Sequence, residues 1–231
     1  SRAGAFADFV ALHERFCWSL NRLAERLGDE QRACEAGALV EPASCSYNGI
    51  FVTDGRFKPG EHVVVYGAGP IGLAAVALLN VAGAATVTVF EPSPVRRRLA
   101  ETMGAHHVFD TSPSGGAIHE IVREITDGAG ADLQVECAGA VTVLMPEIEQ
   151  SFAAGGRLLY LGRTGEKSSV ALDFLVSGAN RVVGSRGHVG GGCFPRILTL
   201  LEHGRLNLEP MITRRFPMSS AIEAIQAAGR L

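Results

Sequence analysis

The stretch VVVYGAGPIGLAAVALLNVAGAATVTVFE, residues 63–91, decides the fold. It begins with a β-branched run that predicts a strand at 62–66, and a second such run predicts a strand at 85–90. Between them, the apolar segment 70–82 predicts a helix, and three glycines surround its start: Gly67, Gly69 and Gly72. A strand, a glycine turn, a helix, a second strand and then the acid Glu91 make up the G-x-G-x-x-G fingerprint of dinucleotide-binding proteins.

Each residue of this fingerprint has a physical role. Gly67 permits the tight turn, Gly69 lets the backbone approach a pyrophosphate, and Gly72 lets the helix pack close to the sheet. Pro70 begins the helix, where its missing N–H costs nothing, and the N-terminus of the helix faces the phosphates. Glu91 follows about 20 residues later, where an acid accepts hydrogen bonds from the ribose of NAD and repels the 2′-phosphate of NADP. We therefore expect NAD as the cofactor.

The composition is typical of a soluble α/β protein. The 231 residues are 47% hydrophobic and 19% charged with a net charge of −3, so no nucleic-acid or acidic-membrane partner is expected. Residues 71–90 are almost uncharged, but Gly83 interrupts them and their second half is β-branched, which favours a buried helix and strand over a membrane span. No signal peptide is visible, and the five cysteines form no C-x-x-C pair. We expect a cytoplasmic protein with free thiols.

Strands and helices alternate regularly from residue 61 onward. The predicted strands are 62–66, 85–90, 107–109, 132–136, 157–161 and 181–184. The predicted helices between them are 70–82, 93–103, 115–126 and 141–153. Six strands joined by crossover helices predict a doubly wound parallel sheet, an α/β fold of Rossmann type.

The two ends of the chain show less regular patterns. Before the sheet, we expect a short strand at 4–12 and helices at 29–38 and 44–55. After the sheet, we expect helices at 194–203 and 219–228.

Five segments resemble the medium-chain dehydrogenase/reductase family, in this order: GAFADFV, GALVEP, KPGEHVVVYGAGPIGLAAVALL, VFEPSPVRRRLAETMGA and ADLQVECAG. Within the family, the chain is most similar to the zinc-dependent polyol and alcohol dehydrogenases. The segments EPASCSYNG, EPSPVRR and SRGHVGGGCFPRIL resemble those of scyllo-inosose and related cyclitol dehydrogenases. The resemblance covers nearly the whole chain. It implies an oxidoreductase that transfers a hydride between NAD and a secondary alcohol with the help of zinc.

The resemblance also implies that part of a typical member is missing. Family members begin with a GroES-like catalytic lobe that carries a zinc-binding cysteine and a Gly-His-Glu motif, which we do not find here. We therefore expect a shortened chain in three parts. Residues 1–43 would be a remnant of the catalytic domain, 44–188 the NAD-binding domain, and 189–231 a segment that returns to the catalytic domain. Because family members often pair their cofactor sheets, we expect a homo-oligomer, either a dimer or a tetramer.

Glu41, in the segment GALVEP, is the candidate metal residue. In the polyol branch this glutamate lies at the catalytic zinc, as a ligand or through the bound water, and a carboxylate is a suitable oxygen ligand. The alternative is a surface acid at a helix end, before Pro42. Cys45 lies four residues further on and is either a second ligand or a small buried residue of the next helix.

Arg186 and His188 are the candidate catalytic residues. They follow the sixth predicted strand, and the C-terminal ends of strands in such sheets face the ligand crevice. Either side chain is expected to reach the nicotinamide ribose or the substrate hydroxyls; the alternative is a charged surface loop. Arg96 is one of three arginines that follow Glu91, and we expect it to cover the adenine or to contact a ribose phosphate. If Arg96 accepted a 2′-phosphate, NADP would bind despite Glu91.

The remaining cofactor contacts are expected at two further strand ends and at the helix start. Cys137 and Gly139 belong to the turn after the fourth strand, which in the family passes under the nicotinamide ribose. Leu161 and Gly162 end the fifth strand, and their backbone groups are expected to bind the carboxamide. Ile71 completes the set in the first turn of the helix.

Three functions fit the sequence. The first is an NAD-dependent dehydrogenase of a polyol, cyclitol or sugar-like substrate, with zinc in the complete protein. The second is a zinc-free NAD(P)H-dependent enone or quinone reductase of the same superfamily, against which Glu91 and the Glu41-Pro42 pair argue. The third is a cofactor-binding module without turnover, which the missing lobe favours.

Overall fold

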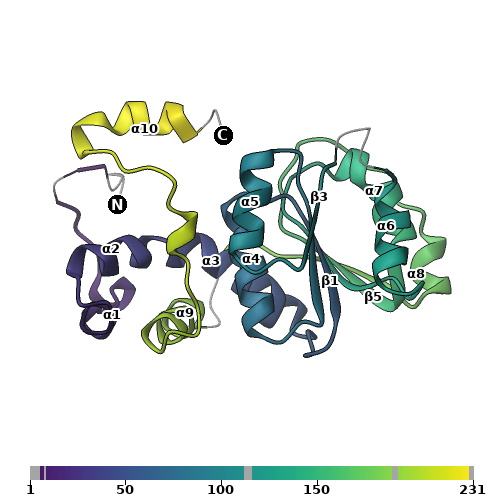
Figure 1. Ribbon diagram of the computed structural model, residues 1–231, viewed down its shortest axis with the longest axis horizontal. Helices are drawn as coiled ribbons and strands as arrows, with labels where there is room; N and C mark the ends of the chain where they lie inside the picture. Colours follow the sequence, from purple (N-terminus) through teal and green to yellow (C-terminus); the bar gives the residue numbers. More distant parts are fainter. Residues whose placement is uncertain (1–5, 8, 112–115, 189–191, 229–231) are drawn as a thin grey trace.

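The computed structural model describes residues 6–7, 9–111, 116–188 and 192–228 and shows a single sheet with helices on both faces (Figure 1). All strand pairs are parallel, and the strand order is β3-β2-β1-β4-β5-β6. The strands are β1 (His62–Tyr66), β2 (Thr86–Phe90), β3 (His107–Phe109), β4 (Ala131–Glu136), β5 (Phe152–Tyr160) and β6 (Arg181–Gly184). This order confirms the predicted doubly wound Rossmann sheet.

Two hydrophobic clusters cover the two faces of the sheet. Side chains along a strand point alternately to opposite faces, so Val63 and Val65 of β1 belong to one cluster and Val64 and Tyr66 to the other. The first face packs against α4 (Pro70–Val81) and α5 (Pro94–Thr102), and the second against α6 (Ile118–Ile125) and α7 (Val141–Gln150). The short α8 (Asp173–Ser177) lies beside this second pair of helices (Figure 1).

A group of helices lies beside the first face, at the side of α4 (Figure 1). Its members are α1 (Asn21–Leu27), α2 (Glu30–Ala38), α3 (Val40–Tyr47), α9 (Cys193–Glu202) and α10 (Ala221–Ala228). The π-helix η2 (Asn48–Asp54) continues α3, and three 3₁₀ turns complete the chain: η1 (Glu14–Phe16), η3 (Glu209–Met211) and η4 (Met218–Ser220). Leu23 of α1 and Ile197 of α9 share one hydrophobic cluster with Val65 of β1. The helical group and the sheet therefore have a common core.

The described helices are all too short or too polar to cross a bilayer. The apolar stretch 71–90 divides between α4 and β2, as its internal glycine predicted. Its high hydrophobicity reflects the burial of α4 against the first face and of β2 within the sheet.

Several sequence predictions for the ends of elements were wrong. The described residues within 4–12 form no strand, because no neighbouring strand pairs with them. The helix predicted at 44–55 begins already at Val40 and changes to a π-helix at Asn48. The helix predicted at 141–153 ends at Gln150, and β5 starts two residues later. Helices α1 and α8 were not predicted, and the first residue of the helix predicted at 115–126 lies outside the described residues.

Candidate functional site

The glycine turn between β1 and α4 has the geometry that the fingerprint predicts. Gly67 has φ +89°, and a Cβ on it would lie 3.1 Å from the backbone nitrogen of Ala138, so only glycine fits without strain. Gly69 precedes α4, and Pro70 is the first residue of the helix. A Cβ on Gly69 would meet no atom within 4 Å. The space in front of the helix N-terminus is therefore open, where the sequence predicts the pyrophosphate.

Glu91 follows β2 directly, but its carboxylate points into the protein. Its side chain is buried at 3% exposure, and its two oxygens accept hydrogen bonds from the backbone N–H groups of Ala68 (2.7 Å) and Ser93 (2.9 Å). The carboxylate therefore ties the glycine turn to the start of α5. Each oxygen retains a further lone pair, and a contact between Glu91 and ribose stays a prediction.

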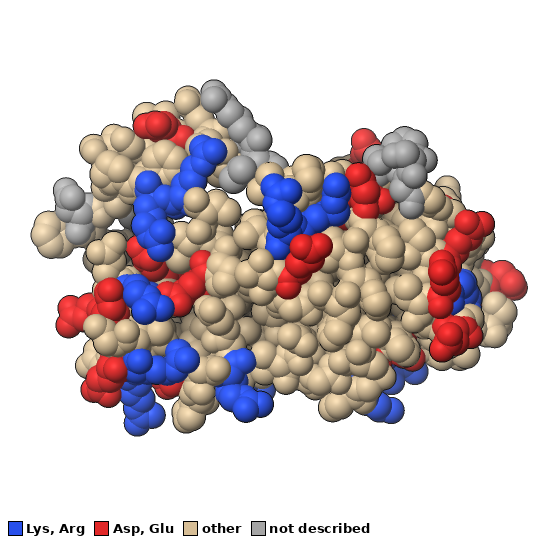
Figure 2. Space-filling view, viewed as in Figure 1, with Lys and Arg blue, Asp and Glu red and all other residues tan. Residues whose placement is uncertain are grey.

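Positive charge gathers over α5, which carries three successive arginines (Figure 2). Arg96 lines a cavity of about 250 Å³ together with Gly69 and Pro70. Arg97 has a structural role, because it donates to the carbonyl oxygens of Glu91 (2.9 Å) and Pro92 (2.7 Å) and pairs with Asp110. Arg96 thus lines the same cavity as the glycine turn, and its contact with adenine or a ribose phosphate stays a prediction.

The turns after β4 and β5 pack against each other. Gly139 has φ +70°, and a Cβ there would approach the carbonyl oxygen of Arg163 to 2.7 Å. Glu136, at the end of β4, is fully buried and accepts hydrogen bonds from the N–H groups of Ala138 (2.9 Å) and Ala140 (3.2 Å). Burial raises the pKa of Glu136, and the hydrogen bonds from the backbone of Ala140 and Ala138 oppose that shift.

Several groups predicted to contact the nicotinamide already form hydrogen bonds within the protein or are buried. The N–H groups of Leu161 and Gly162 both donate to the carbonyl oxygen of Glu136, at 2.9 Å each, which leaves their carbonyl oxygens for the predicted carboxamide contact. Burial raises the pKa of the Cys137 thiol far above its usual range, so this side chain is neutral.

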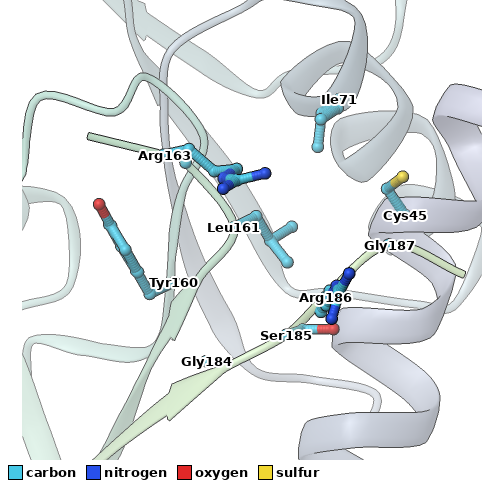
Figure 3. Close-up of a pocket in the computed structure, with 10 residues that line it drawn as sticks. Cys45, Ile71, Tyr160, Leu161, Arg163, Gly184, Ser185, Arg186 and Gly187 are labelled. Atoms are coloured by element: carbon cyan, nitrogen blue, oxygen red, sulfur yellow. The ribbon is translucent and has the colours of Figure 1, made fainter. Parts of the chain in front are cut away.

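A larger cavity of about 880 Å³ opens at the carboxyl ends of β5 and β6 (Figure 3). It brings together four residues of the predicted site, and Cys45 of α3 also lines it. The lining residues are Cys45, Ile71, Tyr160, Leu161, Gly162, Arg163, Gly184, Ser185, Arg186 and Gly187. Such a crevice outside the carboxyl ends of parallel strands is the usual ligand site in this type of sheet.

Glu41, Cys45 and His188 form a cluster beside this cavity. Their candidate ligand atoms all lie within 4.8 Å of one another, and Nδ1 of His188 is 3.7 Å from Oε1 of Glu41. Because α3 begins at Val40, Glu41 and Cys45 are four residues apart on one helix and share a face. A carboxylate, a thiolate and an imidazole are ligands that zinc accepts. Glu41 lies in the first turn of α3, which runs through Pro42, and its side chain is 62% exposed. Its role as a metal ligand stays a prediction.

The loop that carries Arg186 and His188 is anchored at its start. The hydroxyl of Ser185 accepts a hydrogen bond from the side-chain amide of Asn48 (3.2 Å) and lies 3.0 Å from the hydroxyl of Thr53. Both partners belong to the π-helix η2, a rare conformation that is frequent at functional sites. At the far end of the loop, His188 packs edge-on against Phe194, with ring centroids 5.1 Å apart.

Sequence reasoning missed three contributors to this region. Arg163 comes directly after the predicted Leu161 and Gly162, and its place just beyond a strand end could have indicated that it lies at the site. Glu136 ends a strand one residue before the predicted Cys137. Ser185 directly precedes Arg186, but its anchoring depends on η2, more than 100 residues away in the chain.

Comparisons with known proteins agree with this geometry. A family model described as zinc-binding dehydrogenase matches residues 70–203, more than half of the chain. Scyllo-inosose 3-dehydrogenase of Thermotoga maritima is 37% identical over 227 residues, which cover 96% of this chain and 56% of that protein. Sorbitol dehydrogenase of Bos taurus is 30% identical over 234 residues, which cover 97% of this chain and 60% of that protein.

The fold agrees with a solved relative as well. A structure from Thermotoga maritima, provisionally described as an alcohol dehydrogenase, has a TM-score of 0.90 and 36% identity, with 97% of this chain and 57% of that chain covered. The chain thus spans slightly more than half the length of the relatives it matches. The matched family model, the relatives and the sheet order together show that the chain belongs to the zinc-binding dehydrogenase family of medium-chain dehydrogenases/reductases.

Proposed function

We propose that the chain is the cofactor-binding part of a cytoplasmic, homo-oligomeric NAD-dependent dehydrogenase. Its substrate is a secondary alcohol of the polyol, cyclitol or sugar-like class, and zinc assists the reaction in the complete protein. The observation that carries this proposal is the juxtaposition at one sheet edge of an open glycine turn, an 880 Å³ cavity and a cluster of three possible metal ligands. The relative acting on scyllo-inosose supports the substrate class.

Different residues of the chain would bind the pyrophosphate, orient the nicotinamide ring and hold the metal ion. The N-terminus of α4 and the open space at Gly69 receive the pyrophosphate. Ile71 and Leu161 give the larger cavity an apolar wall for the nicotinamide ring, next to the metal cluster. Zinc supplies a Lewis acid that polarises the alcohol oxygen and lowers the pKa of the hydroxyl. Glu41, Cys45 and His188 are the residues of this chain that would hold the ion.

Exposed apolar side chains support the proposal that residues 1–43 and 189–231 contact a second lobe. Phe9 is 94% exposed, and on α10 Ile222 is 74% and Ile225 is 58% exposed. Large apolar side chains with this much exposure are candidates for an interaction surface. The part of the relatives that this chain does not span is the partner we propose for this surface.

The Glu91→Ala variant tests the cofactor preference. We expect weaker NADH binding, because the N–H groups of Ala68 and Ser93 lose their acceptor and the glycine turn loosens. We also expect the ratio of NADPH to NADH dissociation constants to fall about tenfold, because the 2′-phosphate no longer meets a carboxylate. Fluorescence titration of the chain with each reduced cofactor measures both constants.

The matched control is Glu101→Ala, which removes an exposed acid from the other end of α5. It should leave both dissociation constants unchanged. Comparable binding of NADH and NADPH by the unmodified chain would contradict the proposed preference.

Titration with Co²⁺ tests the cluster of Glu41, Cys45 and His188, because the absorption spectrum of bound Co²⁺ depends on its ligands. We expect a sulfur-to-cobalt charge-transfer band in the near ultraviolet, and we expect Cys45→Ser to remove it. Burial raises the pKa of the Cys45 thiol, and the charge of Glu41 adds to that shift. The free thiol is therefore protonated at neutral pH, metal binding releases its proton, and the apparent affinity should rise with pH.

Cys34→Ser is the control for this titration, because Cys34 is an exposed thiol on α2. It should leave the cobalt spectrum unchanged. A spectrum without a sulfur band, or one that survives in Cys45→Ser, would exclude Cys45 as a ligand. The zinc content of the complete protein distinguishes the zinc-dependent dehydrogenase from the zinc-free reductase.

A further inference from the structure

We propose that Arg163 and Arg186 form an anion-binding pair in the 880 Å³ cavity, so that the substrate carries a carboxylate or phosphate in addition to its secondary alcohol. The proposal rests on the proposed function, because that function makes this cavity the place of hydride transfer. It narrows the substrate class from neutral polyols to acidic or phosphorylated ones.

The two arginines reach the same cavity from neighbouring strands. Arg163 lies just beyond the end of β5, and Arg186 just beyond the end of β6. Figure 3 shows both side chains at the cavity, with Leu161 between them. A substrate that fills this space would therefore lie near two positively charged side chains.

The backbone at each arginine is positioned by contacts that reach other elements. At Arg163, the turn that contains Gly139 packs directly on the peptide, so the backbone has little room to shift. At Arg186, the preceding Ser185 is bonded to Asn48 and Thr53 of η2. Such support reduces the loop ordering that ligand binding would otherwise require.

Neither guanidinium is neutralised by the described part of the chain. No carboxylate of residues 6–7, 9–111, 116–188 or 192–228 forms an ion pair with Arg163 or Arg186, and none lines the cavity. Three nearby acids have other partners: Glu166 accepts a hydrogen bond from Thr142, Glu41 faces His188, and the buried Glu136 behind Gly162 accepts from backbone N–H groups. The cavity therefore presents uncompensated positive charge.

An anionic group on the substrate explains this charge better than the cofactor does. Guanidinium groups form bidentate hydrogen bonds with carboxylates and phosphates of opposite charge, whereas a neutral hydroxyl offers neither the bidentate geometry nor the charge. The pyrophosphate of NAD is expected at Gly69 and Pro70, and those two residues line the smaller cavity with Arg96. Arg163 and Arg186 lie at the other cavity, beside the candidate metal ligands.

Calorimetric titration of the chain saturated with NADH tests the pair, because the reduced cofactor prevents turnover of an alcohol. The probes are D-glucitol, D-gluconate and D-glucitol 6-phosphate, which differ in charge and share their secondary hydroxyls. We expect at least one of the anionic probes to bind about tenfold more tightly than glucitol. Arg163→Gln and Arg186→Gln should each remove most of this preference, while Arg163→Lys should retain part of it.

The matched control is Arg181→Gln, which removes an exposed arginine from the opposite end of β6. It should leave the preference intact. Separate NADH titrations identify the source of the anion: unchanged dissociation constants in the two variants support a substrate group, and a large increase would assign the arginines to the cofactor pyrophosphate and overturn the proposal.

The other outcomes are equally decisive. NADH binding without any preference for the charged probes would overturn the anion pair and leave the proposed function standing. No NADH binding by the unmodified chain would overturn the proposed function and this inference with it. Circular dichroism of each variant shows whether a lost preference is due to unfolding.

Discussion

Gly69→Ala is expected to retain its stability and lose most of the affinity for NADH, whereas Gly72→Ala is expected to lose both affinity and much of its stability. The two glycines are three residues apart in the same fingerprint, yet their surroundings differ completely. A Cβ on Gly69 meets no atom within 4 Å, and its φ of −72° suits alanine. A Cβ on Gly72 would overlap the carbonyl oxygen of Gly67.

The expected magnitudes follow from these surroundings. In Gly69→Ala the methyl group occupies the space in front of α4, so the pyrophosphate loses its close approach to the backbone N–H groups. A lost charge-assisted hydrogen bond of about 1.5–3 kcal/mol corresponds to roughly 10–100-fold weaker binding. In Gly72→Ala the backbone of α4 must shift, and we expect the free energy of unfolding to fall by about 3 kcal/mol.

Urea unfolding and NADH fluorescence titration of both variants separate the two effects. Ala82→Gly at the end of α4 is the control. Gly60→Ala is unsuitable, because Gly60 has a positive φ that alanine would strain. It should change neither the cofactor affinity nor the fold by much. Full NADH affinity in a folded Gly69→Ala variant would mean that the pyrophosphate does not approach this turn.

The sequence allowed the sheet to be predicted well because its signals are local. β1 and β2 each contain a β-branched run, and the glycine turn, Pro70 and the acid after β2 all lie within 63–91. The predicted ends of helices and strands were less accurate where one residue type is compatible with two positions. The helix predicted from residue 44 begins at Val40, because proline is suited to the first turn of a helix, which is where Pro42 lies in α3.

The site was less predictable because its geometry depends on contacts between distant segments. Glu41 and Cys45 come together with His188 only when α3 packs beside the end of β6. The direction of the Glu91 carboxylate depends on which backbone N–H groups face it, and the spacing of the motif gives no information on that point. Arg163 carried no motif of its own, and only the shared cavity connects it with Arg186.

Arg157→Met is expected to lower the free energy of unfolding by about 3–5 kcal/mol at neutral pH. The guanidinium of Arg157 is 8% exposed and bridges two acids: Nε lies 2.9 Å from Oδ2 of Asp54, and Nη2 lies 2.7 Å from Oε2 of Glu61. The Asp54 side chain is only 1% exposed. Without the arginine, a charged carboxylate would remain buried with no cation beside it, and urea unfolding measures the cost.

Two further variants separate the buried charge from the loss of an ion pair in general. Arg32→Met breaks a pair with Glu209 whose side chains are 47% and 29% exposed, and it should cost at most about 1 kcal/mol. The double variant Asp54→Leu/Arg157→Met removes the stranded charge, so it should be more stable than Arg157→Met alone. If the double variant were less stable than Arg157→Met, the loss of stability would come from poorer side-chain packing between β5 and η2. Water would then solvate the Asp54 carboxylate in the single variant. The position of η2, whose Asn48 and Thr53 contact Ser185, would depend on packing rather than on the ion pair.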